Sequence, residues 1–106
     1  MAFEFTDSNF QETAIDKGGL TVIDFWAEWC GPCRLVGPII EDLSKEYDGK
    51  ALIGKVNVDE HPEVSFKYQI RSIPTILFLK DGEVVAKHVG TATKQALTDM
   101  IESHLS

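Results

Sequence analysis

The sequence has few basic residues, and they are spread along the chain. Ten Lys and Arg stand against 17 Asp and Glu, so the formal net charge is −7 at pH 7. Proteins that bind nucleic acid usually gather Lys and Arg against the phosphates. Binding to an anionic membrane surface needs a similar basic cluster. The composition therefore argues against both kinds of partner.

Long apolar segments are also lacking. The longest apolar run is far shorter than the roughly 20 residues that cross a membrane. The first seven residues, MAFEFTD, have neither the basic region nor the apolar core of a secretory signal. We therefore expect a cytoplasmic protein. Repeats and linker-like tracts are absent too, and 106 residues with 43% apolar content predict a single domain over residues 1–106.

Cysteine is scarce, and both cysteines lie in one short run, Trp29-Cys30-Gly31-Pro32-Cys33. Two cysteines alone cannot complete a zinc site, and we expect no metal, because the histidines are scattered at His61, His88 and His104. A disulfide stabilises a fold less when it closes a short loop, so this pair would be a poor structural staple. Disulfides in a reducing cytosol are usually transient and catalytic. The spacing therefore predicts a redox-active dithiol.

Hydrophobic periodicity predicts alternating strands and helices. Residues 20–27 (LTVIDFWA) are nearly all apolar and rich in β-branched and aromatic side chains, which is typical of a strand covered on both faces. Apolar spacings of three and four predict helices over 35–47 and 97–105. The Asp81-Gly82 pair predicts a hairpin, so the last two strands are antiparallel. The fold class is therefore α/β with a mixed sheet. Further strands are expected at 3–5, 51–58, 75–79 and 84–86, and a short helix at 62–68.

Two helices carry local signals in the sequence. Ser8 and Gln11 match a capping box for a first helix that ends at Gly18-Gly19. Gly37-Pro38 lies inside the 35–47 pattern and predicts a kink there.

The position of the cysteines predicts different roles for them. Cys30 follows a strand and precedes a helix, whose free N–H groups favour a thiolate. We expect Cys30 to be the exposed nucleophile and Cys33, inside the first helical turn, to be the shielded resolving thiol. Lowering a thiol pKa by about 1.5 raises the thiolate fraction roughly 16-fold at pH 7 but weakens the nucleophile roughly 5-fold. Proximity of Cys33 to the mixed disulfide should therefore contribute more.

Asp24 interrupts an otherwise apolar strand. If it is buried, its pKa rises, and it could accept the proton of Cys33; it could equally be an edge residue that faces solvent. Lys55, in the next strand, is either its partner or an exposed strand lysine. Trp29 is either core packing or part of a docking surface.

The run from Asp24 to Cys33, DFWAEWCGPC, resembles the active-site signature of the thioredoxin family. The resemblance covers essentially the whole chain in order. One position departs from it, because Gly37 stands where alanine is usual. The other matching positions are Pro38, Lys55, Val58-Asp59, Tyr68, residues 70–75, Gly82 and Gly90.

The resemblance implies a thioredoxin fold, with a central five-stranded sheet of order 1-3-2-4-5 flanked by four helices. It implies a cis peptide bond at Pro74, and that Asp24 exchanges protons with Cys33 beside Lys55. It also implies a substrate surface where an extended target pairs with backbone at Ile73. That surface would consist of Trp29, Gly31, Pro32, Ile73, Pro74 and Gly90.

The implied activity is that of a general protein-disulfide reductase, an enzyme that acts as a dithiol electron carrier. The expected partners are disulfide-containing proteins and an NADPH-dependent flavoprotein, thioredoxin reductase, so the chain itself, a monomer, needs no bound cofactor. Within this family, Gly31-Pro32 is typical of reductants, and an oxidase or isomerase is the alternative. A binding module that uses the surface around Trp29 and Pro74 is the alternative from another class.

Overall fold

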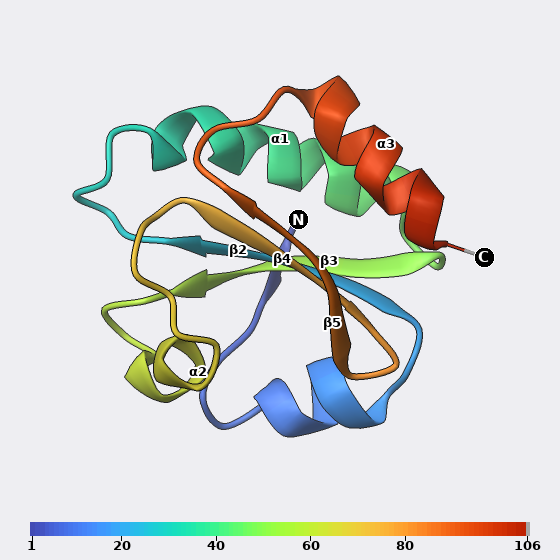
Figure 1. Cartoon of the computed structure of the whole chain (residues 1–106), viewed down its shortest axis with the longest axis horizontal. Helices are drawn as coiled ribbons and strands as arrows, with labels where there is room; N and C mark the ends of the chain where they lie inside the picture. Colours follow the sequence, from blue (N-terminus) through green and yellow to red (C-terminus); the bar gives the residue numbers. More distant parts are fainter. Residues whose placement is uncertain (106) are drawn as a thin grey trace.

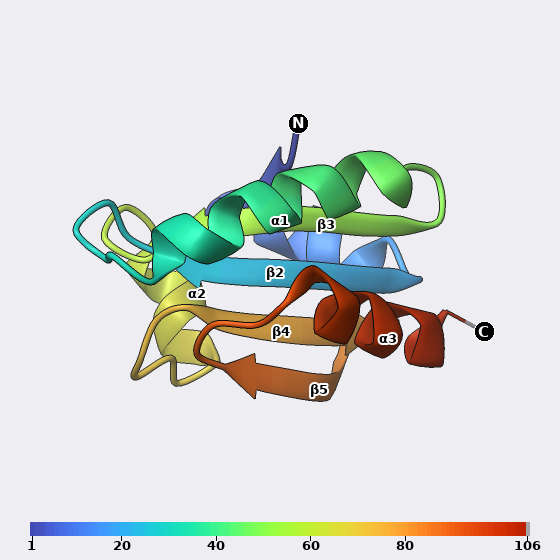
Figure 2. The same cartoon turned by 90° about the horizontal axis from the view of Figure 1, so that it is seen from above.

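A computed structural model describes residues 1–105. Its five strands form one mixed sheet in the order β1-β3-β2-β4-β5, as the resemblance implied. Helices α1 and α3 cover one face of the sheet, and η1 and α2 cover the other (Figures 1 and 2). The elements are β1 (Phe3–Glu4), η1 (Gln11–Asp16), β2 (Leu20–Trp26), α1 (Cys33–Glu46), β3 (Ala51–Asn57), α2 (Pro62–Lys67), β4 (Thr75–Lys80), β5 (Glu83–Val89) and α3 (Lys94–His104).

Strand β2 lies in the centre of the sheet and leads directly to the cysteines. It pairs in parallel with β3 and antiparallel with β4. Because side chains alternate along a strand, Val22 enters the core under α1 and α3, while Ile23 and Phe25 enter the core on the side of η1 and α2. Both faces of β2 are therefore covered, which explains its nearly continuous apolar sequence.

The hairpin between β4 and β5 is confirmed. Asp81 and Gly82 form the two-residue turn, with φ angles of 51° and 85°. A turn with positive φ at both central residues matches the twist of antiparallel strands. The Asp81-Gly82 pair was therefore enough to predict, from local sequence alone, that β5 lies beside β4.

The predicted capping box at Ser8 and Gln11 is wrong. Gln11 Nε2 instead donates to Asp16 Oδ1, at 2.9 Å. The reciprocal pair lies two residues earlier: Thr6 N–H donates to Asn9 Oδ1 (2.8 Å), and Asn9 N–H donates to Thr6 Oγ1 (3.0 Å). Asn9 fills the place that Glu or Gln usually takes, and the pair closes the turn that precedes η1.

Helix α1 begins at Cys33 and contains Pro38 in its interior. The predicted kink at this proline stays a prediction. In the part of the chain that the structure describes, no helix is both long enough and apolar enough to cross a membrane.

Candidate active site

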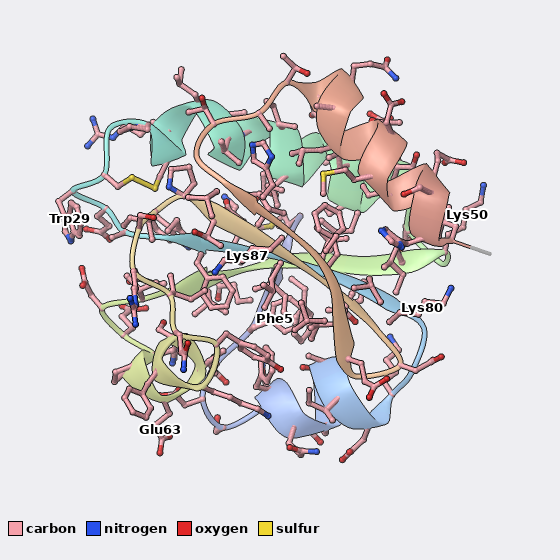
Figure 3. All side chains as sticks on the ribbon, viewed as in Figure 1. Phe5, Trp29, Lys50, Glu63, Lys80 and Lys87 are labelled. Atoms are coloured by element: carbon pink, nitrogen blue, oxygen red, sulfur yellow. A yellow bond between two sulfur atoms is a disulfide. The ribbon has the colours of Figure 1, made fainter. Side chains whose placement is uncertain are left out.

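Cys30 and Cys33 form a disulfide where the chain passes from β2 into α1 (Figure 3). Their Cα atoms are 5.3 Å apart. The backbone N–H of Cys33 donates to Cys30 Sγ at 3.2 Å. Because this N–H belongs to the first turn of α1, it would stabilise negative charge on Cys30 sulfur in the reduced form. The predicted position of the pair at a helix N-terminus is confirmed.

The expected difference in exposure between the two cysteines is not found. Each is only 4% exposed in the disulfide form. Cys30 is covered because its Sγ lies 3.8 Å from the carbonyl oxygen of Ile73, which comes from a distant loop. The two sulfurs therefore differ in their neighbours rather than in their exposure.

The loop before β4 covers the Cys30 side of the disulfide. The Ile73–Pro74 peptide bond is cis, as the resemblance implied. Gly90 N–H donates to the carbonyl oxygen of Pro74 at 2.8 Å, which holds the end of β5 beside this loop. The structure thus brings Ile73, Pro74 and Gly90 together next to Cys30, although they are far apart in the sequence.

Trp29 belongs to the surface and not to the core. It is 70% exposed and lies at the edge of the molecule beside the disulfide (Figure 3). Its indole Nε1 donates to Asp59 Oδ2 at 2.9 Å, which fixes the orientation of the ring. Gly31 and Pro32 are exposed as well. A shallow depression of about 280 Å³ adjoins Trp29, and its other lining residues are Val58, Ile70, Arg71, Ser72 and Ile73.

Asp24 lies on the α1 side of β2 and is fully buried, with 0% of its surface exposed. The alternative of a solvent-facing edge residue is therefore wrong. Neither carboxylate oxygen has a hydrogen-bond partner among residues 1–105. Burial raises the pKa of Asp24 from 3.8 to about 7, and the positive charge of Lys55 opposes that rise.

Lys55 is the register partner of Asp24 on β3. Its side chain is 23% exposed, so it is not a solvated strand lysine. Lys55 Nζ lies 3.3 Å from Glu41 Oε2 and 5.8 Å from the centre of the Trp26 ring. The ammonium of Lys55 is thus paired with Glu41 of α1, a contact that the sequence did not indicate.

An open cleft of about 740 Å³ lies on the Cys33 side of the disulfide. Cys33 and Lys55 both line it, whereas Cys30 does not. A Cβ atom at Gly37, in its wall, would lie 3.5 Å from Lys55 Nζ, which is ordinary contact. Alanine would therefore fit at this position without a clash. The remaining lining residues are Trp26, Ala27, Glu28, Arg34, Pro38, Glu41 and Asp42.

The described residues bring no three His, Cys, Asp or Glu side chains together in an arrangement that could hold a metal ion. The site that they do form combines a disulfide at a helix N-terminus, a buried carboxyl group and an exposed tryptophan.

Comparison with known proteins agrees with this arrangement. The model of the family described as Thioredoxin matches residues 1–103. The chain belongs to the thioredoxin family. This family member is a protein-disulfide oxidoreductase, and Cys30–Cys33 is its redox-active pair. The fold and the family that the sequence predicted are both confirmed.

Several thioredoxins resemble this chain over nearly its whole length. "Thioredoxin" of Chlorobaculum thiosulfatiphilum is 48% identical over 103 residues, which cover 97% of this chain and 95% of that protein. "Thioredoxin" of Staphylococcus saprophyticus subsp. saprophyticus is 48% identical over 100 residues, or 94% of each chain. "Thioredoxin M-type, chloroplastic" of Spinacia oleracea is 46% identical over 97% of this chain and 57% of that protein.

Proposed function

We propose that this protein is a general protein-disulfide reductase. The observation that carries the proposal is the disulfide at the start of α1, together with a buried carboxyl group on β2 that has no hydrogen-bond partner among residues 1–105. In the first step, the Cys30 thiolate attacks one sulfur of a target disulfide and displaces the other as a thiolate. The Cys33 thiolate then attacks Cys30 Sγ. The Cys30–Cys33 disulfide forms, and the target leaves with two added electrons.

Asp24 is the proposed proton acceptor for Cys33. The second step needs a thiolate at Cys33, so the thiol proton must leave before or during the attack. A carboxyl group with a pKa of about 7 is populated in both its charged and its neutral form near neutral pH. Because no group within residues 1–105 donates a hydrogen bond that would stabilise its charge, Asp24 can take up the proton and return it when the pair is reduced again.

The proposed substrate surface surrounds the disulfide. Trp29, Gly31 and Pro32 are exposed on one side of it. Ile73, Pro74 and Gly90 form the other side, and an extended segment of the target would pair with backbone at Ile73. The fixed tryptophan ring supports this assignment, because a large apolar surface held in one orientation loses little entropy on binding.

The electrons are proposed to come from NADPH through a flavoprotein thioredoxin reductase, with no cofactor bound to this chain. The proposed location is the cytoplasm, where the disulfides that do form are usually transient and catalytic.

The reduction potential tests whether the protein works as a reductant. We expect the Cys30–Cys33 pair to equilibrate at a potential well below that of the glutathione pool, because Gly31-Pro32 is the dipeptide of the family's reductants. The oxidised fraction is measured in buffers of defined glutathione ratio, where a difference of about 30 mV corresponds to about 1.4 kcal/mol. A potential well above the pool would identify an oxidant and contradict the proposal.

A Cys33→Ser variant tests the resolving role. The variant can form the mixed disulfide through Cys30, but it lacks the second thiol that would attack this disulfide. Covalent complexes with target proteins should therefore accumulate. Non-reducing gels detect them, and dithiothreitol should release them. The matched control is the variant with both cysteines replaced by serine, which should trap nothing. If Cys33→Ser traps no more than this control, Cys33 is not the resolving thiol.

A further inference from the structure

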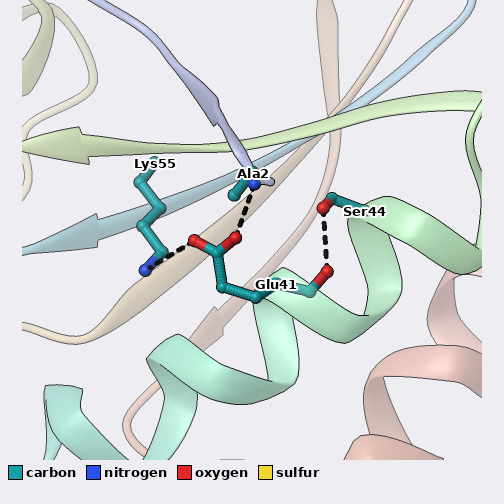
Figure 4. Close-up of polar contacts among 4 residues, drawn as sticks. All are labelled: Ala2, Glu41, Ser44 and Lys55. Carbon is teal, nitrogen blue, oxygen red and sulfur yellow. Dashed lines mark hydrogen bonds and ion pairs between the residues drawn. The ribbon is translucent and has the colours of Figure 1, made fainter.

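The carboxylate of Glu41 connects three segments at the wall of the cleft (Figure 4). Glu41 lies in the middle of α1, and its Oε1 accepts the backbone N–H of Ala2 at 2.7 Å. Its Oε2 lies 3.3 Å from Lys55 Nζ on β3. The hydrogen bond from Ala2 lowers the pKa of Glu41, so that the carboxylate remains charged and can hold the lysine.

Two carboxyl groups, those of Asp24 and Glu41, are candidate partners for Lys55. Its backbone is in register with Asp24, and both side chains lie on the sheet face that α1 covers. Yet its ammonium is paired with Glu41 and lies over the Trp26 ring, while both oxygens of Asp24 lack a partner in the described chain. A lysine paired directly with Asp24 would favour the ionised carboxylate. The ammonium of Lys55 is therefore held by Glu41 and not by Asp24.

We propose that Glu41 is a positioning residue that holds Lys55 at the α1 wall of the cleft and so keeps Asp24 able to bind a proton near neutral pH. The consequence for catalysis rests on the proposed function, in which Asp24 accepts the proton of Cys33. The effect on Asp24 itself does not depend on that role, and it can be measured separately.

Glu41 is one of several charged residues that line the cleft, and Asp24 is not itself among the lining residues. Strand β4 contributes only Ile76 as the opposite register neighbour of Asp24, and α3 packs with apolar Leu97 and Ile101 on this face. The charged groups come from β3, from α1 and from the segment before it, namely Lys55, Glu41, Arg34, Asp42 and Glu28. Among these, Lys55 is the one whose charge acts on the pKa of Asp24.

The first test is Glu41→Gln in the oxidised protein, where the cysteines do not titrate. The amide oxygen can still accept the Ala2 N–H, but the ion pair is lost and Lys55 is free to approach Asp24. We expect the titration midpoint of the Asp24 carboxyl carbon, followed by ¹³C NMR, to fall by about one pH unit. The matched control is Glu46→Gln, which removes the same charge from the same helix where Glu46 pairs with Lys94 in solvent. It should move the midpoint by less than about 0.3 pH unit.

A double variant shows whether Glu41 acts through Lys55. In a Lys55→Met background, Glu41→Gln should move the Asp24 midpoint by less than a third of its effect in the wild-type protein. The proposal is overturned if Glu41→Gln has no larger effect than Glu46→Gln, or if its effect is undiminished without Lys55. If the midpoint moves as expected but Asp24→Asn reduces disulfides at an unchanged rate from pH 6 to 8, the positioning of Lys55 is supported and the proton-acceptor role fails.

Discussion

Replacing Cys30 by serine is expected to lower the catalysed reduction of insulin disulfides to the rate of dithiothreitol alone, a loss of roughly 10³-fold or more. A serine hydroxyl is not ionised near neutral pH, and its oxygen cannot form the disulfide that carries the electrons. The N–H of Cys33, which lies 3.2 Å from the Cys30 sulfur, would then have no thiolate to stabilise. The turbidity of precipitating insulin chains, with dithiothreitol as the donor, measures the rate.

The two single cysteine variants serve as controls for each other. Cys33→Ser should release about one equivalent of target thiol in a single turnover and then stop, whereas Cys30→Ser should release none. Thermal unfolding of both variants in the reduced state shows whether either substitution disturbs the fold. Turnover of Cys30→Ser clearly above the dithiothreitol background would exclude Cys30 as the nucleophile.

Asp24→Asn is expected to stabilise the protein relative to the wild type increasingly as the pH rises from about 4 to about 7, and by no more above pH 7. The ordinary pKa of an aspartate, 3.8, applies to Asp24 in the unfolded chain, and burial raises the pKa to about 7 in the folded protein. Below pH 4 the carboxyl is protonated in both the folded and the unfolded state, and it contributes no pH dependence. Between pH 4 and about pH 7, Asp24 is ionised in the unfolded chain but stays protonated in the folded protein. The wild-type protein therefore loses stability at about 1.4 kcal/mol per pH unit, or about 4 kcal/mol in total.

Urea unfolding of the oxidised proteins at several pH values measures this effect. A buried asparagine amide also lacks a partner, and that cost lowers the stability of the variant by a similar amount at every pH. The informative quantity is therefore the growing difference between the two curves. Asp48→Asn is the control, because Asp48 is exposed at a turn, where substitutions change stability by within about 0.5 kcal/mol. Parallel curves for the wild type and Asp24→Asn would show that Asp24 is ionised in the folded protein throughout this range.

This stability cost distinguishes Asp24 from the rest of β2. Every other residue from Leu20 to Phe25 is buried and contributes to the core or to the sheet, as expected for a central strand. A carboxyl group at that place is expected to weaken the fold near neutral pH, because burial raises its pKa. Natural sequences usually keep such an inconsistency where function requires it, which supports the proposed role of Asp24 in proton transfer.

Features that depend on neighbouring residues could be predicted without a structure. The apolar run of β2, the Asp81-Gly82 hairpin and the cysteines at the start of α1 could all be predicted. Each depends on local patterns, such as the alternation of a strand or the φ angles of a tight turn. The resemblance to the thioredoxin family then supplied the strand order, which no local pattern contains.

The way in which distant segments complete the site could not be predicted from local patterns and depends on the folded chain. The carbonyl oxygen of Ile73 contacts Cys30 Sγ, and Cys30 is as buried as Cys33. Lys55, which the sequence left as either a partner of Asp24 or an exposed lysine, pairs with Glu41. Likewise, the N-terminus of α2 is capped by Asp7, whose carboxylate accepts the N–H groups of Glu63 (3.2 Å) and Val64 (2.9 Å). These contacts join residues 14 to 57 positions apart. They exist only because the sheet order and the packing of helices bring those residues within hydrogen-bonding distance. The hydrophobic periodicity of the sequence does not predict such contacts.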